Sequence, residues 1–344
     1  MSTSNQTYCW GQNPLGTLGT GDSIQRMVPA RSNPGMSFTK VVIGKGTGEF
    51  ACGLTTDRSA YCWGVRMKLG DGVLAPYPEY SAIPVLVAGG RKYLDIAAGG
   101  DHACAVSTEG DAWCWGYNGG GQLGTGIDGP SWVPALVAGG HKYKAVSANI
   151  VSTCAVGTDG AAYCWGSNIA PGDGTQTGGK APTPVAGGLV FDSISVGLWF
   201  VCGVTQDGDG YCWGDNGTGN LGNGSFNRTG GPVTTPSKVA GNLKWKSIAA
   251  AVSVACGVTV DGMGYCWGGN VMGERGNGKT SSPDVAAPEP VAGDLKFSAI
   301  SADWHTCGLT TAGDVYCWGP GAYGALGNGD TSGRNVPTPV AGPR

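Results

Sequence analysis

Charged residues are scarce in this 344-residue chain, and neither sign dominates. Lys and Arg total 21 and Asp and Glu total 24, which gives a formal net charge of −3 and a charged fraction of 13%. Such a balance provides no concentrated positive field for a phosphate backbone or an anionic membrane. We therefore expect no nucleic-acid partner. No run of eighteen apolar residues occurs, so we expect no membrane insertion either.

Histidine is also scarce, and the familiar catalytic motifs are missing. The chain has 3 histidines, at positions 102, 141 and 305. It contains no P-loop, no HExxH and no GxSxG sequence. We therefore predict no catalytic residue, no metal site and no cofactor, and a protein that is not an enzyme.

Glycine, by contrast, is abundant, and a short tripeptide recurs. The chain has 65 glycines and 20 prolines at a hydrophobic content of 41%, which indicates many short strands joined by tight turns rather than disorder. Cys-Trp-Gly appears seven times, at intervals of 48 to 54 residues. Repeats of about this length are typical of propeller blades.

Each repeat contains four predicted strands. The first carries an aromatic residue and, three positions later, Ile or Val; the second carries a cysteine; the third ends in Cys-Trp-Gly; the fourth contains proline. Since proline lacks a ladder donor, the fourth strand should lie at the outer edge. The turn between the second and third strands should hold one left-handed residue, a position occupied by glycine in five units and by Arg58 in the other.

In six units two cysteines lie ten residues apart, and the hairpin register places them opposite each other. We therefore predict six cross-strand disulfides. The alternative is that these cysteines are reduced core side chains; zinc is disfavoured because no CxxC spacing occurs. The predicted pairs are Cys52 with Cys62, Cys104 with Cys114, Cys154 with Cys164, Cys202 with Cys212, Cys256 with Cys266, and Cys307 with Cys317.

Disulfides persist in oxidising compartments, so an extracellular or cell-surface location is expected. The first six residues lack the basic and apolar regions of a secretion signal. On this interpretation the signal is absent from the chain as given.

The repeat resembles that of the regulator of chromosome condensation family. The resemblance covers the whole chain and is carried by the sequence from Trp115-Gly116-Tyr117-Asn118 to Gln122-Leu123-Gly124-Thr125-Gly126. It implies an all-β, seven-bladed propeller of four-stranded antiparallel blades. The implied single domain, 1–344, divides into an outer half-blade, 1–37, and blades at 38–90, 91–140, 141–188, 189–243, 244–295 and 296–344.

The seventh blade is expected to be incomplete in this chain. The first unit begins at its third strand, so Cys9 has no partner ten residues earlier and is predicted to be unpaired. Three explanations are open: truncation, altered ring closure, or strands donated by another subunit. The first two are favoured over the third.

Candidate ligand-binding residues lie in the loops between first and second strands, which should gather around one end of the channel. These loops vary while the framework repeats, and they combine large aromatics with carboxylates. The alternative is that the apolar members plug the channel. The candidates are Glu49, Phe50, Asp101, His102, Trp199, Phe200, Asp303, Trp304 and His305.

The leading functional hypothesis is a secreted propeller that binds another protein or a glycan through this end. One alternative is a self-assembling structural subunit joined through the incomplete blade and Cys9. Another, implied only by the family resemblance, is a guanine-nucleotide exchange factor. Four Asn-x-Ser/Thr sequons, at Asn5, Asn216, Asn223 and Asn227, lie in polar or Gly-rich sequence where glycans are sterically possible if the source glycosylates its secreted proteins.

Overall fold

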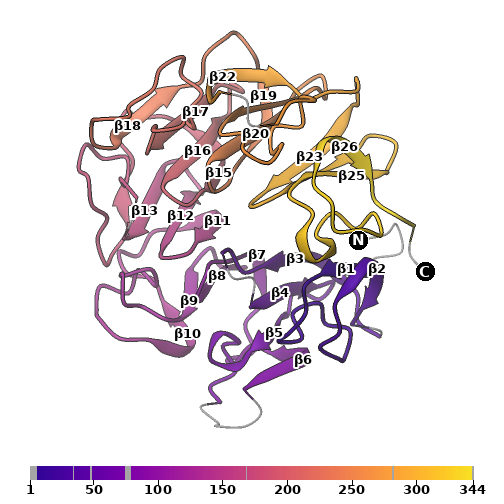
Figure 1. The fold of residues 1–344 in the computed structure, drawn as a ribbon. Helices are drawn as coiled ribbons and strands as arrows, with labels where there is room; N and C mark the ends of the chain where they lie inside the picture. The colour runs from indigo at the N-terminus through magenta and orange to yellow at the C-terminus, as the bar shows by residue number, and fades with distance from the viewer. Residues whose placement is uncertain are drawn as a thin grey trace.

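A computed structural model describes residues 6–33, 35–46, 49–73, 79–167, 169–280 and 283–342. The described residues form six four-stranded antiparallel sheets and one two-stranded sheet. Figure 1 shows the sheets arranged as blades around a central axis, with the two chain ends close together. The all-β propeller predicted from the repeat is confirmed.

The blades follow one another in chain order. In blade 1 the strands are β3 (Phe38–Ile43), β4 (Phe50–Thr55), β5 (Ala60–Val65) and β6 (Tyr80–Leu86); in blade 2, β7 (Tyr93–Ala98), β8 (His102–Ser107), β9 (Ala112–Gly116) and β10 (Ser131–Leu136); in blade 3, β11 (Tyr143–Asn149), β12 (Ser152–Gly157), β13 (Ala162–Gly166) and β14 (Thr183–Pro184). In blade 4 they are β15 (Phe191–Val196), β16 (Phe200–Thr205), β17 (Gly210–Gly214) and β18 (Val233–Lys238); in blade 5, β19 (Trp245–Ala250), β20 (Val254–Thr259), β21 (Gly264–Gly268) and β22 (Val285–Pro290); in blade 6, β23 (Phe297–Ala302), β24 (Thr306–Thr310), β25 (Val315–Gly319) and β26 (Arg334–Pro339).

The seven-bladed prediction needs a correction. Near the N-terminus only β1 (Thr7–Gly11) and β2 (Arg26–Ser32) form a sheet, and they pair with each other alone. The described residues therefore form six complete blades and the outer half of a seventh, as expected for an incomplete seventh blade. Cys9 lies on β1 and is buried without a disulfide partner, as predicted.

All six predicted disulfides are present. In each blade the two cysteines are directly opposed across the second and third strands, with Cα atoms 4.0 to 4.1 Å apart. The opposed register follows from the turn. Because the turn loop has an odd number of residues, two residues that are ten positions apart in sequence lie directly opposite each other. Each inner hairpin is thus covalently closed.

The turn prediction is confirmed as well. Gly110 adopts φ 84° and Arg58, the departure from glycine, adopts φ 65° at the equivalent position. Arg58 still donates its backbone N–H to the Thr55 carbonyl at 2.8 Å. The turn geometry is therefore kept even where the side chain disfavours it.

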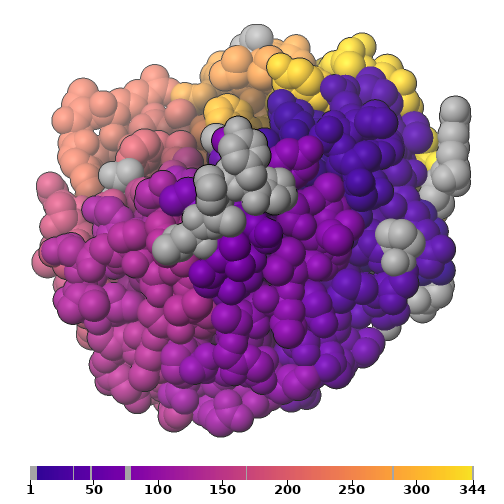
Figure 2. Space-filling model, turned by 90° about the horizontal axis from the view of Figure 1, so that it is seen from below, coloured from indigo at the N-terminus to yellow at the C-terminus, as the bar shows by residue number. Residues whose placement is uncertain are grey.

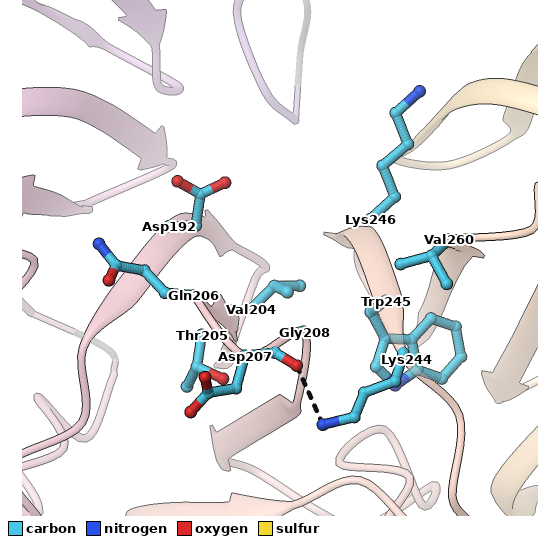
Figure 3. Close-up of a pocket in the computed structure, with 10 residues that line it drawn as sticks. All are labelled: Asp192, Val204, Thr205, Gln206, Asp207, Gly208, Lys244, Trp245, Lys246 and Val260. Atoms are coloured by element: carbon cyan, nitrogen blue, oxygen red, sulfur yellow. Dashed lines mark hydrogen bonds between the residues drawn. The ribbon is translucent and has the colours of Figure 1, made fainter.

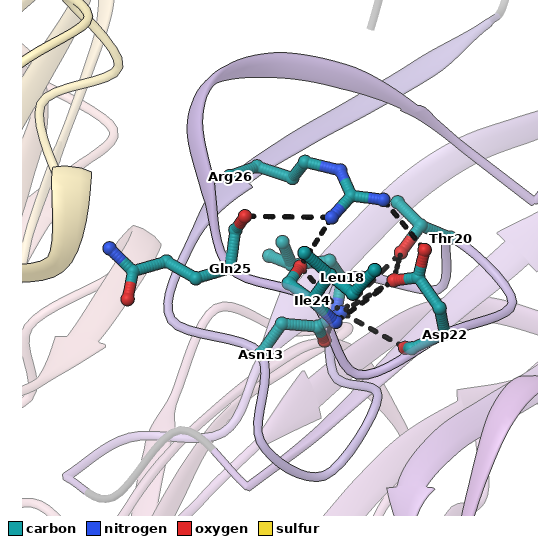
Figure 4. A network of polar contacts seen from close by, with 7 residues as sticks. All are labelled: Asn13, Leu18, Thr20, Asp22, Ile24, Gln25 and Arg26. Carbon is teal, nitrogen blue, oxygen red and sulfur yellow. Dashed lines mark hydrogen bonds and ion pairs between the residues drawn. The ribbon is translucent and has the colours of Figure 1, made fainter.

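In four described glycine-rich loops one asparagine organises the loop. Asn13 accepts a hydrogen bond from the Leu18 backbone N–H at 2.9 Å and donates to the carbonyls of Asp22 and Ile24 (Figure 4). Arg26 adds an ion pair to Asp22 at 2.6 Å. Asn118 and Asn216 accept the corresponding backbone bond in their own blades. The repeated Asn is thus a structural residue.

Each framework tryptophan joins its blade to the preceding one. Six of these indoles are fully buried. Five of them donate to a carbonyl of the preceding loop at 2.7 to 3.2 Å: Trp63 to Thr17, Trp115 to Lys68, Trp165 to Gln122, Trp267 to Asn220 and Trp318 to Glu274. Trp213 follows the shortened loop of blade 3, and its Nε1 has no acceptor among the described residues.

The same contact closes the ring. Trp10 on β1 donates to the Ala325 carbonyl, beside the 3-10 helix η2 (Ala322–Gly324) of blade 6. The Gly329 N–H donates to the Met27 carbonyl at 3.0 Å on the neighbouring strand β2. Figure 2 shows the indigo N-terminal segment against the yellow C-terminal blade. The half-blade therefore docks on blade 6 through the same tryptophan contact that five of the six complete blades make with their predecessors.

The fourth strands are outer edge strands. Pro84 lies in β6 and Pro184 in β14, and each of these strands pairs with one neighbour only. β14 has two residues and follows one of the two shortened glycine stretches. Within the described part of the chain, no helix is long and apolar enough to cross a bilayer.

Candidate binding site

The loops between first and second strands meet at one end of the propeller. The Lys45 N–H donates to the Gly99 carbonyl of the next blade at 3.0 Å, and the Leu198 N–H donates to the Ala251 carbonyl at 2.9 Å. Asn149 reaches the Val196 carbonyl at 3.2 Å. These bonds between successive blades place the predicted loops side by side and hold them in fixed positions.

Three of the nine candidate residues belong to the core. Phe50, His102 and Phe200 are fully buried, as is Val254 at the corresponding position of blade 5. They begin the second strands, where the side chain packs between neighbouring blades. The structure therefore favours the packing alternative for these positions, and a ligand does not reach them in this conformation.

His102 has a defined hydrogen-bonding role. Its Nε2 lies 2.8 Å from the Thr153 hydroxyl, which itself donates to the Gln122 carbonyl at 3.0 Å. The hydroxyl proton is thus committed, so Nε2 carries the hydrogen. Burial lowers the pKa of His102 to about 4, against smaller opposing effects of Asp101 and the Ile150 backbone. His102 is therefore neutral at pH 7 and joins blade 2 to blade 3.

A buried lysine connects two of the other candidates. Lys68 ends the 3-10 helix η1 (Arg66–Lys68), and its side chain is 3% exposed. Its ammonium lies 2.6 Å from Glu49 and 2.7 Å from Asp101, and it donates to the Gly100 carbonyl at 3.2 Å. Both carboxylates remain partly open to solvent. The cluster carries one positive and two negative charges, so it presents a net negative surface at this end.

Sequence reasoning missed Lys68. The residue lies where blade 1 departs from the glycine-rich motif, at the position of Gln122 in blade 2. Its backbone carbonyl accepts the Trp115 indole, as that of Gln122 accepts Trp165. The available signal was a charged residue directly before the motif leucine, Leu69.

Two tryptophans are the exposed aromatics among the candidates. Trp199 is 45% exposed and Trp304 is 57% exposed, on the loops of blades 4 and 6. Asp303 and His305 are half-buried beside Trp304. Burial lowers the pKa of His305, partly opposed by Asp303 and reinforced by Lys45. This end therefore combines two open indoles with the carboxylates of Glu49, Asp101 and Asp303.

A pocket not predicted from the sequence opens at the opposite end, beside the turn between β16 and β17. Its volume is about 420 Å³, and its walls include Asp192, Asp207, Lys244 and Trp245 (Figure 3). Lys244 donates to the Asp207 carbonyl at 2.9 Å across one side. Trp245 itself is a buried framework residue, so the pocket is a shallow hollow between blades 4 and 5.

The sequons differ in accessibility. Asn216 is buried, and its side chain donates to the Ser225 carbonyl at 2.9 Å. A glycan there would disrupt the loop, which corrects the expectation for this site. Asn223 and Asn227 are half-buried in the same region. Asn5 lies outside the described residues.

The fold and its contacts define a class: a β-propeller whose complete blades each contain a cross-strand disulfide and a buried framework tryptophan, which in five of the six donates to the preceding loop. Residues 109–156, 207–260 and 312–344 match the Regulator of chromosome condensation (RCC1) repeat, and residues 94–122 match a second description of that repeat. The chain therefore contains RCC1 repeats, and cysteine pairs lie in its blades.

Curated relatives share the repeat over different lengths. The chain is 27% identical to the RCC1 domain-containing protein RUG3, mitochondrial, of Arabidopsis thaliana, over 97% of this chain and 70% of that protein. It is 29% identical to the Ultraviolet-B receptor UVR8 of the same plant, over 96% of this chain and 64% of the receptor. Against human E3 ubiquitin-protein ligase HERC2 it is 33% identical, over 37% of this chain but 3% of the ligase.

Solved structures share the fold. A chain in the crystal structure of Kap60 bound to yeast RCC1 (Prp20) superposes with a TM-score of 0.85 at 21% identity, covering 97% of this chain and 83% of that one. Human WBSCR16 gives the same TM-score at 19% identity, covering 98% and 94%. Prp20p of Saccharomyces cerevisiae, a structure described with its binding to Gsp1p and histones, gives 0.85 at 22% identity, covering 99% and 87%. Identities this low establish the architecture alone.

Proposed function

We propose that this propeller is a protein-binding module that captures its partner through the loop end carrying Trp199 and Trp304. The observation that carries the proposal is the contrast between these two indoles and the framework tryptophans. Six framework indoles are fully buried, whereas Trp199 and Trp304 are about half exposed. The loop of Trp199 bonds to blade 5 through the Leu198 N–H, and the strand before Trp304 accepts a bond from Lys45 at the Ala302 carbonyl. Tryptophan held open on a rigid surface is typical of binding hot spots.

The charges of this end favour a partner with a basic rim. Glu49 and Asp101 share one lysine, and Asp303 adds another carboxylate near Trp304. Complementary charge at the rim mainly raises the association rate and excludes wrong partners. A partner presenting Lys or Arg around an apolar centre fits this arrangement.

Binding of other proteins by relatives of the fold supports the proposal in general terms. One such structure is described as bound to Kap60, and another with binding to Gsp1p and histones. The histone binding conflicts with our exclusion of nucleic-acid partners, which rested on net charge alone, and we do not carry that exclusion forward. Within the described residues no contact favours a glycan, a self-assembling subunit or an exchange factor over a protein-binding module.

We assign the module no catalytic role. His102 is buried, neutral and bonded to Thr153, and His141 stacks on Tyr163 with ring centroids 4.2 Å apart. His305 is half-buried, and burial lowers its pKa, which favours the neutral ring. These environments suit packing and hydrogen bonding rather than proton transfer.

We also propose that the protein works in an oxidising compartment. Six disulfides, one in each complete blade, support this location. Protein purified without reductant from its native source and then unfolded in denaturant should yield a single alkylatable thiol, that of Cys9, which is buried in the fold. Thirteen free thiols in that material would overturn the proposed compartment.

The binding proposal is tested by comparing immobilised wild-type protein with the double variant Trp199→Ala, Trp304→Ala. Proteins retained from an extract of the source are quantified by mass spectrometry, and the strongest is purified and titrated against both forms. We expect at least a hundredfold weaker binding by the double variant, since hot-spot residues each contribute about 2 kcal/mol or more.

Val260→Ala provides the matched control. Val260 is an exposed apolar residue at the opposite end, in the turn after β20. Its replacement should leave the titration unchanged. Equal affinity of the wild type and the double variant, with both folded, would reject this site.

A further inference from the structure

Within the described residues, the junction between blades 3 and 4 lacks two contacts that the other four junctions between complete blades have (Figure 1). At each of those four junctions, the framework tryptophan of the later blade donates to a loop carbonyl of the earlier one. Here that tryptophan is Trp213, whose Nε1 is buried and has no acceptor among the described residues. The first missing contact is therefore an indole hydrogen bond between the blades.

The second missing contact is an ion pair beside the turn between the second and third strands. In blades 2, 3, 5 and 6 the residue directly before the first strand is a lysine, which pairs with an aspartate in that turn of the preceding blade. In blade 4 this residue is Val190. Asp159, in the turn of blade 3, accepts the Ala161 N–H at 3.0 Å, and no ion pair of the described residues includes it. The four pairs, with N–O distances of 2.6 to 3.7 Å, are Lys92 with Asp57, Lys142 with Asp111, Lys244 with Asp209, and Lys296 with Asp261.

Val190 occupies the place of the missing lysine. A Cβ added to the turn glycine Gly160 would lie 2.5 Å from the Val190 Cγ1, and the lysines of three other junctions lie over their turn glycines in the same way. Asp159 has the same position in its turn as Asp57, which pairs with Lys92. A lysine at position 190 would therefore reach the Asp159 carboxylate.

The polar contacts that remain at this junction join the innermost strands, β11 and β15. The Val196 N–H donates to the Ser147 hydroxyl oxygen at 3.0 Å, and the Asn149 side chain donates to the Val196 carbonyl at 3.2 Å. The Lys144 ammonium lies 3.5 Å from the Asp192 carboxylate. The inner edges of blades 3 and 4 are thus tied together, whereas the two missing contacts involve the third strands and the turn that leads into them.

Apolar packing holds the outer part of the junction. Trp213 belongs to one apolar cluster with Ile169 and Val185 of blade 3, and clusters of the same kind fill the other junctions. The outermost strand of blade 3, β14, has two residues. When the outer parts separate, water reaches the Trp213 Nε1, so opening supplies a hydrogen bond to this indole. At the other four junctions opening breaks an indole bond instead, which makes it less favourable there.

We propose that the ring opens between blades 3 and 4, with the outer strands of the two blades separating about the tied inner strands β11 and β15. The opening divides the end that carries the candidate binding residues. Trp199 and Trp304 lie on blades 4 and 6, whereas Glu49 and Asp101 lie on blades 1 and 2. A partner that contacts both groups favours the closed junction, because a ligand shifts an equilibrium towards the state that it binds better. This last consequence rests on the proposed function; the opening itself does not.

Equivalent backbone amides report on each junction. The first N–H of each first strand donates to a turn carbonyl of the preceding blade, and hydrogen exchange at that amide requires this bond to open. Exchange of the full chain is followed by mass spectrometry. We expect a protection factor for Phe191 at least tenfold lower than those of Tyr143 and Trp245, at the two adjacent junctions. The five bonds, of 2.7 to 2.9 Å, are Tyr93 to Arg58, Tyr143 to Gly110, Phe191 to Gly160, Trp245 to Gly208, and Phe297 to Gly262.

Two variants of one residue connect the exchange rate to the missing ion pair. Val190 is 43% exposed, so the fold should persist in both, which unchanged far-ultraviolet circular dichroism verifies. Val190→Lys supplies the partner of Asp159 and should raise the protection of Phe191 at least threefold. Val190→Gln adds a long side chain without charge and should leave that protection unchanged.

A reciprocal variant transfers both differences to another junction. Lys142→Val with Trp165→Phe removes the ion pair and the indole bond between blades 2 and 3. The protection of Tyr143 should fall at least tenfold, while that of Trp245 stays unchanged.

Equal protection of Phe191, Tyr143 and Trp245 in the wild-type protein would overturn the proposal. So would a low protection of Phe191 that Val190→Lys and Val190→Gln change to the same extent. These measurements use the protein without a partner, so their outcome is independent of whether Trp199 and Trp304 bind one.

Discussion

Trp10 donates its indole N–H to the carbonyl oxygen of Ala325 at 2.9 Å, between residues 315 positions apart in the chain. This bond repeats, across the closing point of the ring, the contact that Trp63 makes with Thr17 at 2.7 Å. The half-blade is thus held by the same device as a complete blade. It lacks the cross-strand disulfide that each complete blade has.

Trp10→Phe should loosen the half-blade selectively. The variant loses an indole hydrogen bond, which contributes about 1 kcal/mol, and leaves the Ala325 carbonyl unsatisfied. Hydrogen exchange should accelerate in β1 and β2 and stay unchanged in blades 2 to 5. Trp213→Phe is the matched variant, because the Trp213 Nε1 has no acceptor among the described residues. Uniform acceleration over the whole chain would contradict a local closing contact.

Replacing the whole Arg275–Glu289 pair, as Arg275→Leu with Glu289→Val, should stabilise the protein. Arg275 takes the motif position occupied by the buried residues Leu123 and Leu221 in other blades, and it is itself 1% exposed. Burial lowers its pKa, against the opposing charge of Glu289 at 3.5 Å. Replacing both members of a buried ion pair by apolar residues is neutral or gains about 1 to 4 kcal/mol, whereas removal of one member leaves the other charge unpaired. Urea unfolding should show a higher midpoint; a lower one would mean that the guanidinium is structurally required.

Arg58→Gly should also stabilise the protein, by about 1 kcal/mol. Arg58 holds φ 65°, a left-handed conformation that L-residues with a Cβ disfavour by about 1 to 2 kcal/mol. Glycine removes this conformational cost from the folded state. It also raises the conformational entropy of the unfolded chain, which offsets part of the gain in stability. The control is Gly110→Arg in blade 2, where the free energy of unfolding should fall. Thermal unfolding of both variants measures the difference.

His102 should make stability depend on pH between about 6.5 and 4. Its pKa is lowered to about 4 in the fold, so protonation favours the unfolded state. The contribution is complete above the unfolded pKa and is lost as pH falls towards the folded pKa, by roughly 3 kcal/mol in total. His102→Phe, the residue found at the equivalent positions 50 and 200, should flatten the curve in this interval. Identical wild-type and variant curves would show that His102 is not the titrating group.

Removing one disulfide should cost about 2 to 3 kcal/mol. In the chain-entropy account, a loop closed over a separation of 10 residues restricts the unfolded chain by about this amount. The double variant Cys154→Ala, Cys164→Ala should therefore unfold at lower denaturant concentration. Cys9→Ala is the comparison and should cost less, because Cys9 closes no loop. Equal losses would assign the effect to packing rather than to the covalent bond.

Local features of the fold were predictable because they depend on spacing. The distance from Cys52 to Cys62 fixed the hairpin register, and the single residue at its centre fixed the left-handed turn. Arg58 is the one residue at this position that is not glycine, and it adopts the same left-handed conformation. Proline in the fourth strands likewise placed them at the outer edge.

The candidate site was only partly predictable, since burial depends on how neighbouring blades meet. Phe50 and Trp199 both lie in or next to variable loops, yet one is enclosed and the other open. Lys68 was missed because its two carboxylate partners come from other loops, 19 and 33 residues away in sequence. Contacts of this kind depend on how neighbouring blades are placed in the ring, and the sequence of a single repeat does not contain that information.

The distribution of disulfides determines how the molecule would respond to a pull on its two ends. In each complete blade the two cysteines are separated by 10 residues, and the disulfide prevents this segment from being extended. Over six blades, about 200 Å of the chain's contour length cannot be extended while the disulfides are intact. The β1–β2 sheet has no such restraint and meets the force first. Under tension the protein would release its N-terminal half-blade early and then extend in shortened steps, which reducing agents would restore to full length.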